Sequence, residues 1–143
     1  MKDRFKVVVA VHLILIKNNE ILLLRRYNTG YEDGNYSVIA GHLDGNEDVI
    51  TAMIRETKEE AGIAINEQDV KVVQTMHRKS DDERIDFFLK CDKWENEIVN
   101  MEFNKCDELK WFDINNLPSN VIPYVRKGIE NYKNGVTFDN FGW

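Results

Sequence analysis

Residues 47–61 constrain the fold more than any other part of the sequence, because apolar side chains recur there at the spacing of an α-helix. Asn46 is a candidate N-cap for this helix, and Gly62 is typical of the position just past a helix end. The residues that share the apolar stripe are Val49, Ile50, Met53, Ile54, Thr57 and Ala61. We therefore expect an amphipathic helix at 47–61 that buries one face against another layer.

Segments rich in Val, Ile and Leu on both sides of this helix predict that the other layer is a β-sheet. Residues 5–16 and 21–24 form a predicted hairpin with Asn18 and Asn19 in its turn. Further strands are expected at 36–40, 70–76, 85–91 and 108–112, and a second helix at 121–134. Loops are expected at 28–35, at 41–46 and at the charged residues 77–84. Together these elements predict an α/β (α+β) fold in which helices cover a mixed sheet.

The length of 143 residues is typical of a single domain, expected here at 1–143. The aromatic residues Phe138, Phe141 and Trp143 near the end could cover a groove or form a dimer contact, but a small satellite core is favoured. We therefore expect a monomer or a homodimer.

The charge balance argues against a protein that holds nucleic-acid polymers by neutralising phosphates, because 19 Lys and Arg face 25 Asp and Glu. Cys91 and Cys106 lack the spacing of a zinc site or a disulfide framework, which favours a reducing compartment. The apolar run at 7–16 is too short to span a bilayer and is interrupted by His12. We expect a cytoplasmic protein that acts neither on a nucleic-acid polymer nor at a membrane.

Three carboxylates crowd one side of the predicted helix, since Glu56, Glu59 and Glu60 fall within an arc of roughly 100°. The like-charged pair Glu56 and Glu60 costs a few tenths of a kcal/mol, and the last turn of a helix favours cations. One interpretation is a solvated acidic face relieved by Arg55 and Lys58. The other is a site for Mg²⁺ or Mn²⁺, hard cations that would cancel the repulsion.

The spacing of these residues resembles the Nudix box of the Nudix hydrolases, which cleave a nucleoside diphosphate from another group linked to it. Gly41 is followed after five residues by Glu47, and after seven more by the sequence Arg-Glu-Thr-Lys-Glu-Glu-Ala-Gly-Ile at 55–63. Two positions depart from the family's pattern: Thr57, where an aliphatic residue is preferred, and the Ala-Gly-His at 40–42, where many members have Pro-Gly-Gly. The resemblance implies a Nudix-type α/β/α sandwich on a central mixed sheet.

The same resemblance implies roles for the residues of the box. Glu56, Glu59 and Glu60 would be metal ligands, and the carbonyl group of Gly41 would add a fourth. Arg55 would hold carboxylates in place by bidentate hydrogen bonds. Glu59 is slightly favoured over the other glutamates as the catalytic base, with Mg²⁺ or Mn²⁺ as the cofactor. Glu47, in contrast, is equally compatible with orienting Arg55 and with a first-turn acid that favours the helix dipole.

The sequence constrains the identity of the substrate less than it constrains the type of reaction. Residues 18–26 resemble a strand of MutT-type nucleoside triphosphate pyrophosphohydrolases, which implies that Arg26 approaches the substrate phosphates. A surface arginine on an edge strand is an equally good interpretation. The box is not followed closely by the proline typical of family members acting on ADP-ribose, nor by the tyrosine typical of those acting on diadenosine polyphosphates. Trp111 is expected to pack in the core rather than to stack on a base.

These observations favour a small-molecule nucleotide as substrate, foremost a canonical or oxidised nucleoside triphosphate that yields nucleoside monophosphate and pyrophosphate. Two alternatives stay open: hydrolysis of another nucleotide derivative, such as a nucleotide sugar or a dinucleotide, and a nucleotide sensor of Nudix fold without turnover.

Overall fold

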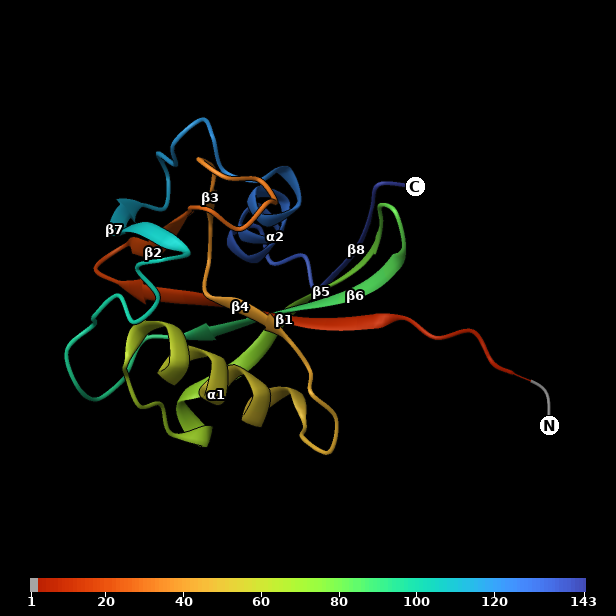
Figure 1. Ribbon diagram of the computed structural model, residues 1–143, viewed down its shortest axis with the longest axis horizontal. Helices are drawn as coiled ribbons and strands as arrows, with labels where there is room; N and C mark the ends of the chain where they lie inside the picture. The colour runs from red at the N-terminus through yellow and green to blue at the C-terminus, as the bar shows by residue number, and fades with distance from the viewer. Residues whose placement is uncertain (1–2) are drawn as a thin grey trace.

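A computed structural model describes residues 3–143, which form a mixed β-sheet with one long helix on each face (Figure 1). The helices are α1 (Val49–Ala61) and α2 (Pro123–Lys133), and a short 3₁₀ turn, which the sequence did not predict, lies at Glu67–Asp69. The strands are β1 (Val8–Lys17), β2 (Glu20–Arg26), β3 (Tyr36–Ser37), β4 (Ala40–His42), β5 (Val70–Lys79), β6 (Glu83–Cys91), β7 (Cys106–Asp113) and β8 (Phe138–Phe141). Within residues 3–143, no helix is long and apolar enough to cross a membrane.

The sheet mixes parallel and antiparallel pairs, in the order β3-β2-β1-β6-β5-β8, with β4 also paired to β1 and β7 to β2. The expected hairpin of β1 and β2 is antiparallel, whereas β1 and β6 run parallel. Helix α1 covers one face of the sheet and α2 covers the other (Figure 1). The expected α/β/α sandwich on a mixed sheet is confirmed.

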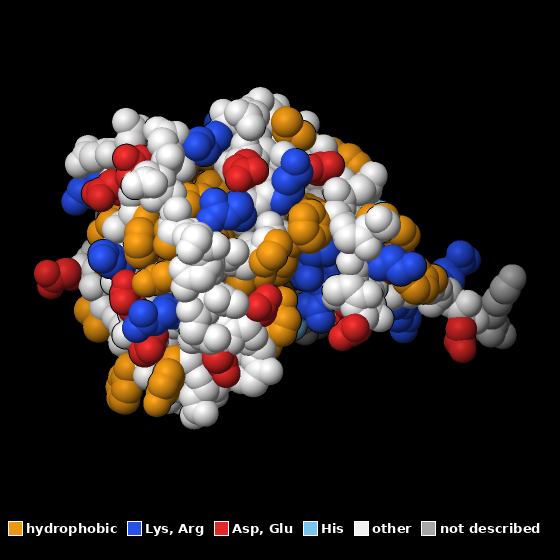
Figure 2. Space-filling model, turned by 90° about the horizontal axis from the view of Figure 1, so that it is seen from above, with side chains coloured by type: hydrophobic (Ala, Val, Ile, Leu, Met, Phe, Trp, Pro, Cys, Tyr) orange, Lys and Arg blue, Asp and Glu red, His pale blue; other side chains and the backbone are white. Residues whose placement is uncertain are grey.

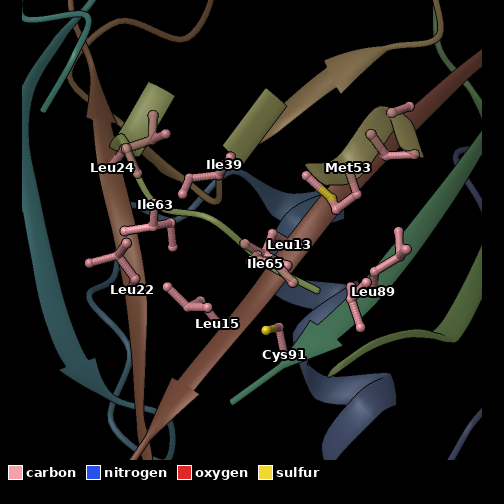
Figure 3. Packing of buried hydrophobic residues seen from close by; sticks show 14 of the residues in the cluster. Leu13, Leu15, Leu22, Leu24, Ile39, Met53, Ile63, Ile65, Leu89 and Cys91 are labelled. Carbon is pink, nitrogen blue, oxygen red and sulfur yellow. The ribbon is translucent and has the colours of Figure 1, made fainter. Parts of the chain in front are cut away.

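Alternation along the strands divides the core into two clusters, one under each helix. In β1, Leu13 and Leu15 belong to the α1 side, whereas Ile14 between them belongs to the α2 side. Figure 3 shows the α1 side, where Met53 from the helix packs with Leu13 and Leu89. Because both faces of β1 are buried, its sequence reads as a nearly continuous apolar run.

The first helix begins two residues later than the sequence predicted. Its N-cap is Asp48, whose carboxylate accepts a hydrogen bond of 2.8 Å from the backbone N–H of Thr51. Asn46 instead lies in the preceding turn, with a positive φ of 56°. Gly62 ends the helix in the left-handed conformation at φ 69°, as expected. Glu47 therefore precedes the helix and is not a first-turn acid.

The prediction of a solvated loop at 77–84 was wrong for most of its length. Strand β5 continues to Lys79 and β6 already begins at Glu83, so that only 80–82 form the turn. The charged residues Arg78 and Asp86 are buried on the same face of the sheet, where they form an ion pair with each other. The number of charges in a segment does not predict such a buried ion pair, because the two side chains meet only when β5 and β6 are paired.

The end of the chain joins the sheet instead of forming a separate core. Strand β8 pairs parallel to β5, at the edge of the sheet. Phe141 packs against the α2-side cluster, whereas Phe138 is exposed. Trp143 donates a hydrogen bond of 3.0 Å to the carbonyl group of His77. Trp111 packs beside Trp94 against the α1-side core, as the sequence predicted.

Candidate active site

The two halves of the box meet where β4 passes next to α1. Gly41 pairs with Val11 of β1, and a side chain at position 41 would overlap the carboxyl group of Glu56. Position 41 therefore has to be glycine for the Glu56 carboxylate to lie against the backbone of β4. The turn at 43–48 brings the start of α1 back toward β4, so that Glu56 on the helix can reach the backbone of the strand.

Arg55 lies at the centre of the carboxylates. Its Nε and Nη2 atoms donate to the two carboxylate oxygens of Glu47 at 3.0 and 2.7 Å. Its Nη1 atom donates to Glu56 at 2.9 Å and reaches Glu59 at 3.4 Å. The bidentate bond with Arg55 lowers the pKa of Glu47 to about 2. Arg55 thus holds together carboxylates that would otherwise repel one another.

Glu60 has the most unusual environment of the three helix glutamates. Its Oε2 atom is buried and has no hydrogen-bond partner within residues 3–143. Burial, followed by the nearby charges of Glu56 and Glu102, raises the pKa of Glu60 well above its usual value. Burial also raises the pKa of Glu56, although Arg55 opposes this shift. An unsatisfied carboxylate oxygen among other carboxylates is costly unless a cation binds it.

The residues present fit a hard divalent cation. All the candidate ligands are oxygens, the Glu60 Oε2 atom lacks a hydrogen-bond partner among the described residues, and the side chain of Glu59 is 53% exposed. Within the described part of the chain, no three His, Cys, Asp or Glu side chains converge closely enough to hold a metal. Arg55 engages Glu56 and Glu59 in this arrangement, so metal binding would require these carboxylates to turn from Arg55 toward Glu60.

Arg26 lies at the end of β2, next to a β-bulge between Arg25 and Arg26. Its guanidinium donates to the carbonyl group of Tyr31 at 2.7 Å and to the hydroxyl group of Thr29 at 3.1 Å. It borders two cavities, a small one of about 90 Å³ that also contacts Glu60, and a larger one of about 590 Å³ that reaches Gly41. The structure therefore places Arg26 beside the box and not on an isolated surface.

Two features of this region were missed by reasoning from the sequence. Glu102, from the loop before β7, lines the small cavity together with Glu60. The larger cavity is lined by His12, Arg78 and Tyr124, three residues from distant parts of the chain. Two signals in the sequence could have pointed to this cavity. One is His12 within an apolar run, and the other is the alternation that places Arg78 two residues after the buried Met76.

Comparison with known proteins agrees with the fold and with the box. Residues 6–132 match the family model of the NUDIX domain. An ADP-ribose pyrophosphatase from Methanocaldococcus jannaschii is 31% identical over 138 residues, which cover 89% of this chain and 75% of that protein.

Two solved structures have the same fold at low sequence identity. A MutT NUDIX hydrolase from Burkholderia pseudomallei superposes with a TM-score of 0.80 at 22% identity, covering 88% of this chain and 98% of the other. A MutT protein from Methanosarcina mazei Go1 has a TM-score of 0.76 at 17% identity, covering 90% and 94%. Since the family model spans most of the chain, this protein belongs to the Nudix family and is a Nudix hydrolase.

Proposed function

We propose that the protein hydrolyses a nucleoside triphosphate to the nucleoside monophosphate and pyrophosphate, with a divalent cation, Mg²⁺ or Mn²⁺, as cofactor. The observation that carries this proposal is the position of Arg26, which lines one cavity with Glu60 and a second with Gly41. A triphosphate chain that lies along the box would meet both the oxygen ligands for the cation and a guanidinium donor.

The carboxylates divide into two groups by environment. Glu56 and Glu60 have raised pKa values because they are buried, and they would hold the cation together with the Gly41 carbonyl group. Glu59 is more exposed and is the best placed of the three to reach a solvent molecule, so it would act both as a ligand and as the base. The bound cation would screen the phosphate charges and lower the pKa of an attacking water. Arg55 would position the glutamates rather than touch the phosphates.

ADP-ribose is the second candidate substrate, because the Methanocaldococcus jannaschii relative is named an ADP-ribose pyrophosphatase. Both substrates contain the phosphoanhydride link that the box would cleave. They differ in what lies beyond it, a phosphate in one and a second ribose in the other.

Product analysis separates these activities. The protein would be incubated with Mg²⁺ and a panel of nucleoside triphosphates, nucleotide sugars, dinucleotides and ADP-ribose, with and without excess chelator. We expect the highest kcat/KM on a triphosphate, pyrophosphate as a product, and no turnover in chelator. A higher kcat/KM on ADP-ribose would replace the substrate class, and turnover in chelator would contradict the role of the glutamates. Glu56→Gln should lose most of the turnover, whereas its matched control Glu67→Gln, in the exposed 3₁₀ turn, should keep it.

A further inference from the structure

The cavity of about 590 Å³ lies on the α2 side of the sheet, directly beside Gly41. Ala10 and His12 of β1 line it, as do Arg78 of β5, Arg84 of β6 and Tyr124 of α2. Its volume is in the range of cavities that take small molecules. Figure 2, which views the molecule from this side, shows Lys and Arg side chains recessed between apolar and uncharged ones. A substrate cleaved at the box would place its remaining part here.

Four polar side chains are packed together at this cavity. Asp86 is fully buried and accepts a hydrogen bond of 2.6 Å from Arg78, which is only 6% exposed. His12 is also buried and lies 3.0 Å from the hydroxyl group of Tyr124. Apolar residues would fill the same space at lower cost, since a buried ion pair contributes little to stability. The box does not need these residues, so their polarity points to a ligand.

The charges at this cavity nearly cancel, with Arg26 at one end and Asp81 adding a carboxylate from the turn at 80–82. Arg78 is paired with Asp86, and Arg84 with Asp82 at 2.8 Å. Burial lowers the pKa of His12 to about 4, so the imidazole is neutral at pH 7. Arg26 is the one arginine of the cavity outside any ion pair within residues 3–143. The phosphates are therefore expected at Arg26, and the part near Arg78 suits a neutral hydrogen-bonding group.

Arg78 is held in a fixed orientation by its neighbours. Its Nε and Nη2 atoms bond to the two oxygens of Asp86 at 2.6 and 3.4 Å, and its guanidinium carbon lies 3.7 Å from the centre of the Tyr124 ring. The Nη1 group makes no hydrogen bond to residues 3–143, although the side chain lines the cavity. One N–H of Nη1 and the second N–H of Nη2 thus form a parallel pair of donors, on a rigid and positively charged group, that is available to a ligand.

A fixed group of donors distinguishes between purine bases. Guanine and hypoxanthine present two adjacent acceptors, O6 and N7, which arginine binds more often than any other base edge. Adenine presents N7 beside an amino group, and that group would place donor against donor. A neutral base with a 6-oxo group suits both the free pair of N–H donors on Nη1 and Nη2 and the pairing of the Arg78 charge with Asp86.

We propose that Arg78 is a specificity-determining residue that selects nucleotides with a 6-oxopurine base over those with adenine. The proposal rests on the proposed function to the extent that the substrate is a nucleotide, but it does not require that a triphosphate is the form cleaved. Asp86 and Tyr124 are positioning residues that hold the guanidinium in place.

The test compares inosine and adenosine monophosphates, which share sugar and phosphate and differ in the group at position 6 and in the hydrogen on N1. Their dissociation constants would be measured by calorimetry in excess chelator, so that binding is read without turnover, and kcat/KM would be measured for ITP and ATP with Mg²⁺. We expect the wild-type protein to bind inosine monophosphate about tenfold more tightly. Equal affinities, or no binding of either nucleotide at millimolar concentration, would overturn the proposal.

Variants assign the preference to Arg78. Arg78→Gln together with Asp86→Asn removes both charges, so that no buried carboxylate is left unpaired. This double variant should bind the two nucleotides about equally or favour adenosine monophosphate, because an amide can pair with N6 and N7 of adenine. The matched control is Arg25→Gln together with Asp107→Asn, which removes an ion pair that lines neither cavity and should keep the wild-type ratio. Arg78→Lys, which preserves the partner of Asp86, gives a second test if the double variant does not fold.

The outcomes also separate this inference from the proposed function. An Arg78-dependent preference without hydrolysis of any triphosphate would leave the inference standing and overturn the proposed function. Hydrolysis of ITP and ATP at equal kcat/KM, with equal binding of the monophosphates, would do the reverse. If inorganic phosphate binds to the wild type but not to the double variant, the cavity end at Arg78 is an anion site, and the base assignment is wrong.

Discussion

Arg55 and Glu47 are joined by two hydrogen bonds, from Nε to Oε2 at 3.0 Å and from Nη2 to Oε1 at 2.7 Å. Glu47 lies before the first turn of α1, whereas Arg55 lies in the middle of that helix. The bond therefore ties the loop after Gly41 to the helix that carries the other glutamates. It also fixes the guanidinium at the point where Glu56 and Glu59 can reach it.

Glu47→Gln should lower kcat/KM by about 10- to 100-fold, the usual effect of removing a residue that orients metal ligands. A neutral amide accepts only one of the two donors, so Arg55 can shift toward Glu56 and Glu59 and compete with the cation. The Mg²⁺ concentration for half-maximal activity should rise in parallel. Glu67→Gln should change neither value. Wild-type metal dependence in Glu47→Gln would show that Arg55 is held well enough by its other partners.

Glu60→Gln should separate stability from activity. The raised pKa of Glu60 means that the folded protein binds a proton at this carboxyl more tightly than the unfolded chain does. Its contribution to the free energy of unfolding therefore falls as pH rises above the unfolded pKa of about 4.5. Without metal at pH 7.5, the variant should melt at the same temperature as the wild type or higher, and the difference should shrink toward pH 4.5.

The activity of the same variant should fall by about 100-fold or more if Glu60 is a metal ligand. A thermal shift with Mn²⁺ should be present in the wild type and reduced in Glu60→Gln. Near-wild-type turnover would make Glu60 a structural acid. A lower melting temperature without metal would instead reveal a hydrogen bond that the carboxylate makes in solution.

The sequence was sufficient to predict the parts of the fold that depend on local patterns. The stripe of apolar residues located α1, and Gly62 located its end, because both signals lie within one segment. The N-cap was assigned to Asn46 instead of Asp48, since both are good caps and only the backbone turn at 46 distinguishes them. The glycine at position 41 was recognised, and the reason for it, contact with Glu56, required the structure.

Features that depend on pairing between distant segments could not be predicted in this way. Arg78 and Asp86 look like solvated charges until β5 and β6 are paired, when each neutralises the other. Tyr124 joins this cluster from a helix 112 residues after His12. Strand β8 was missed because its four residues include Asp139 and Asn140, and only the free edge of β5 makes it a strand. The sequence thus predicted the Nudix box but not the cavity beside it.

His12 should make the protein less stable as pH falls from about 6.5 to 4. Burial lowers its pKa to about 4, against the pull of Asp86, so the unfolded chain takes up a proton in this range while the folded protein does not. The loss is at most about 3 kcal/mol, since one pKa unit corresponds to about 1.4 kcal/mol. Arg78, Asp86, Tyr124 and His42 are the charged or titratable groups that face it.

Denaturant unfolding at several pH values checks this effect. As pH falls from 7.5 to 4.5, the wild type should lose more free energy of unfolding than His12→Gln does. The value for the variant minus the value for the wild type should therefore increase. His77→Gln, at a partly exposed position, is the control and should give a much smaller change. A difference that is independent of pH would mean that the imidazole titrates alike in the folded and unfolded protein, and the opposite trend would mean that the folded imidazole is protonated and paired with Asp86.

Arg26→Ala tests the part of the site that holds the phosphates. The guanidinium is bonded to the 29–31 loop and lines both cavities, so its loss should raise KM for a triphosphate about tenfold or more. The melting temperature should change little, because the side chain is partly exposed and lies outside the two core clusters. Arg25→Ala is the matched control, since Arg25 is paired with Asp107 and Glu108 and lines neither cavity. A larger effect of Arg25→Ala than of Arg26→Ala, in steady-state kinetics on the preferred triphosphate, would assign the phosphate contact to the other face of β2.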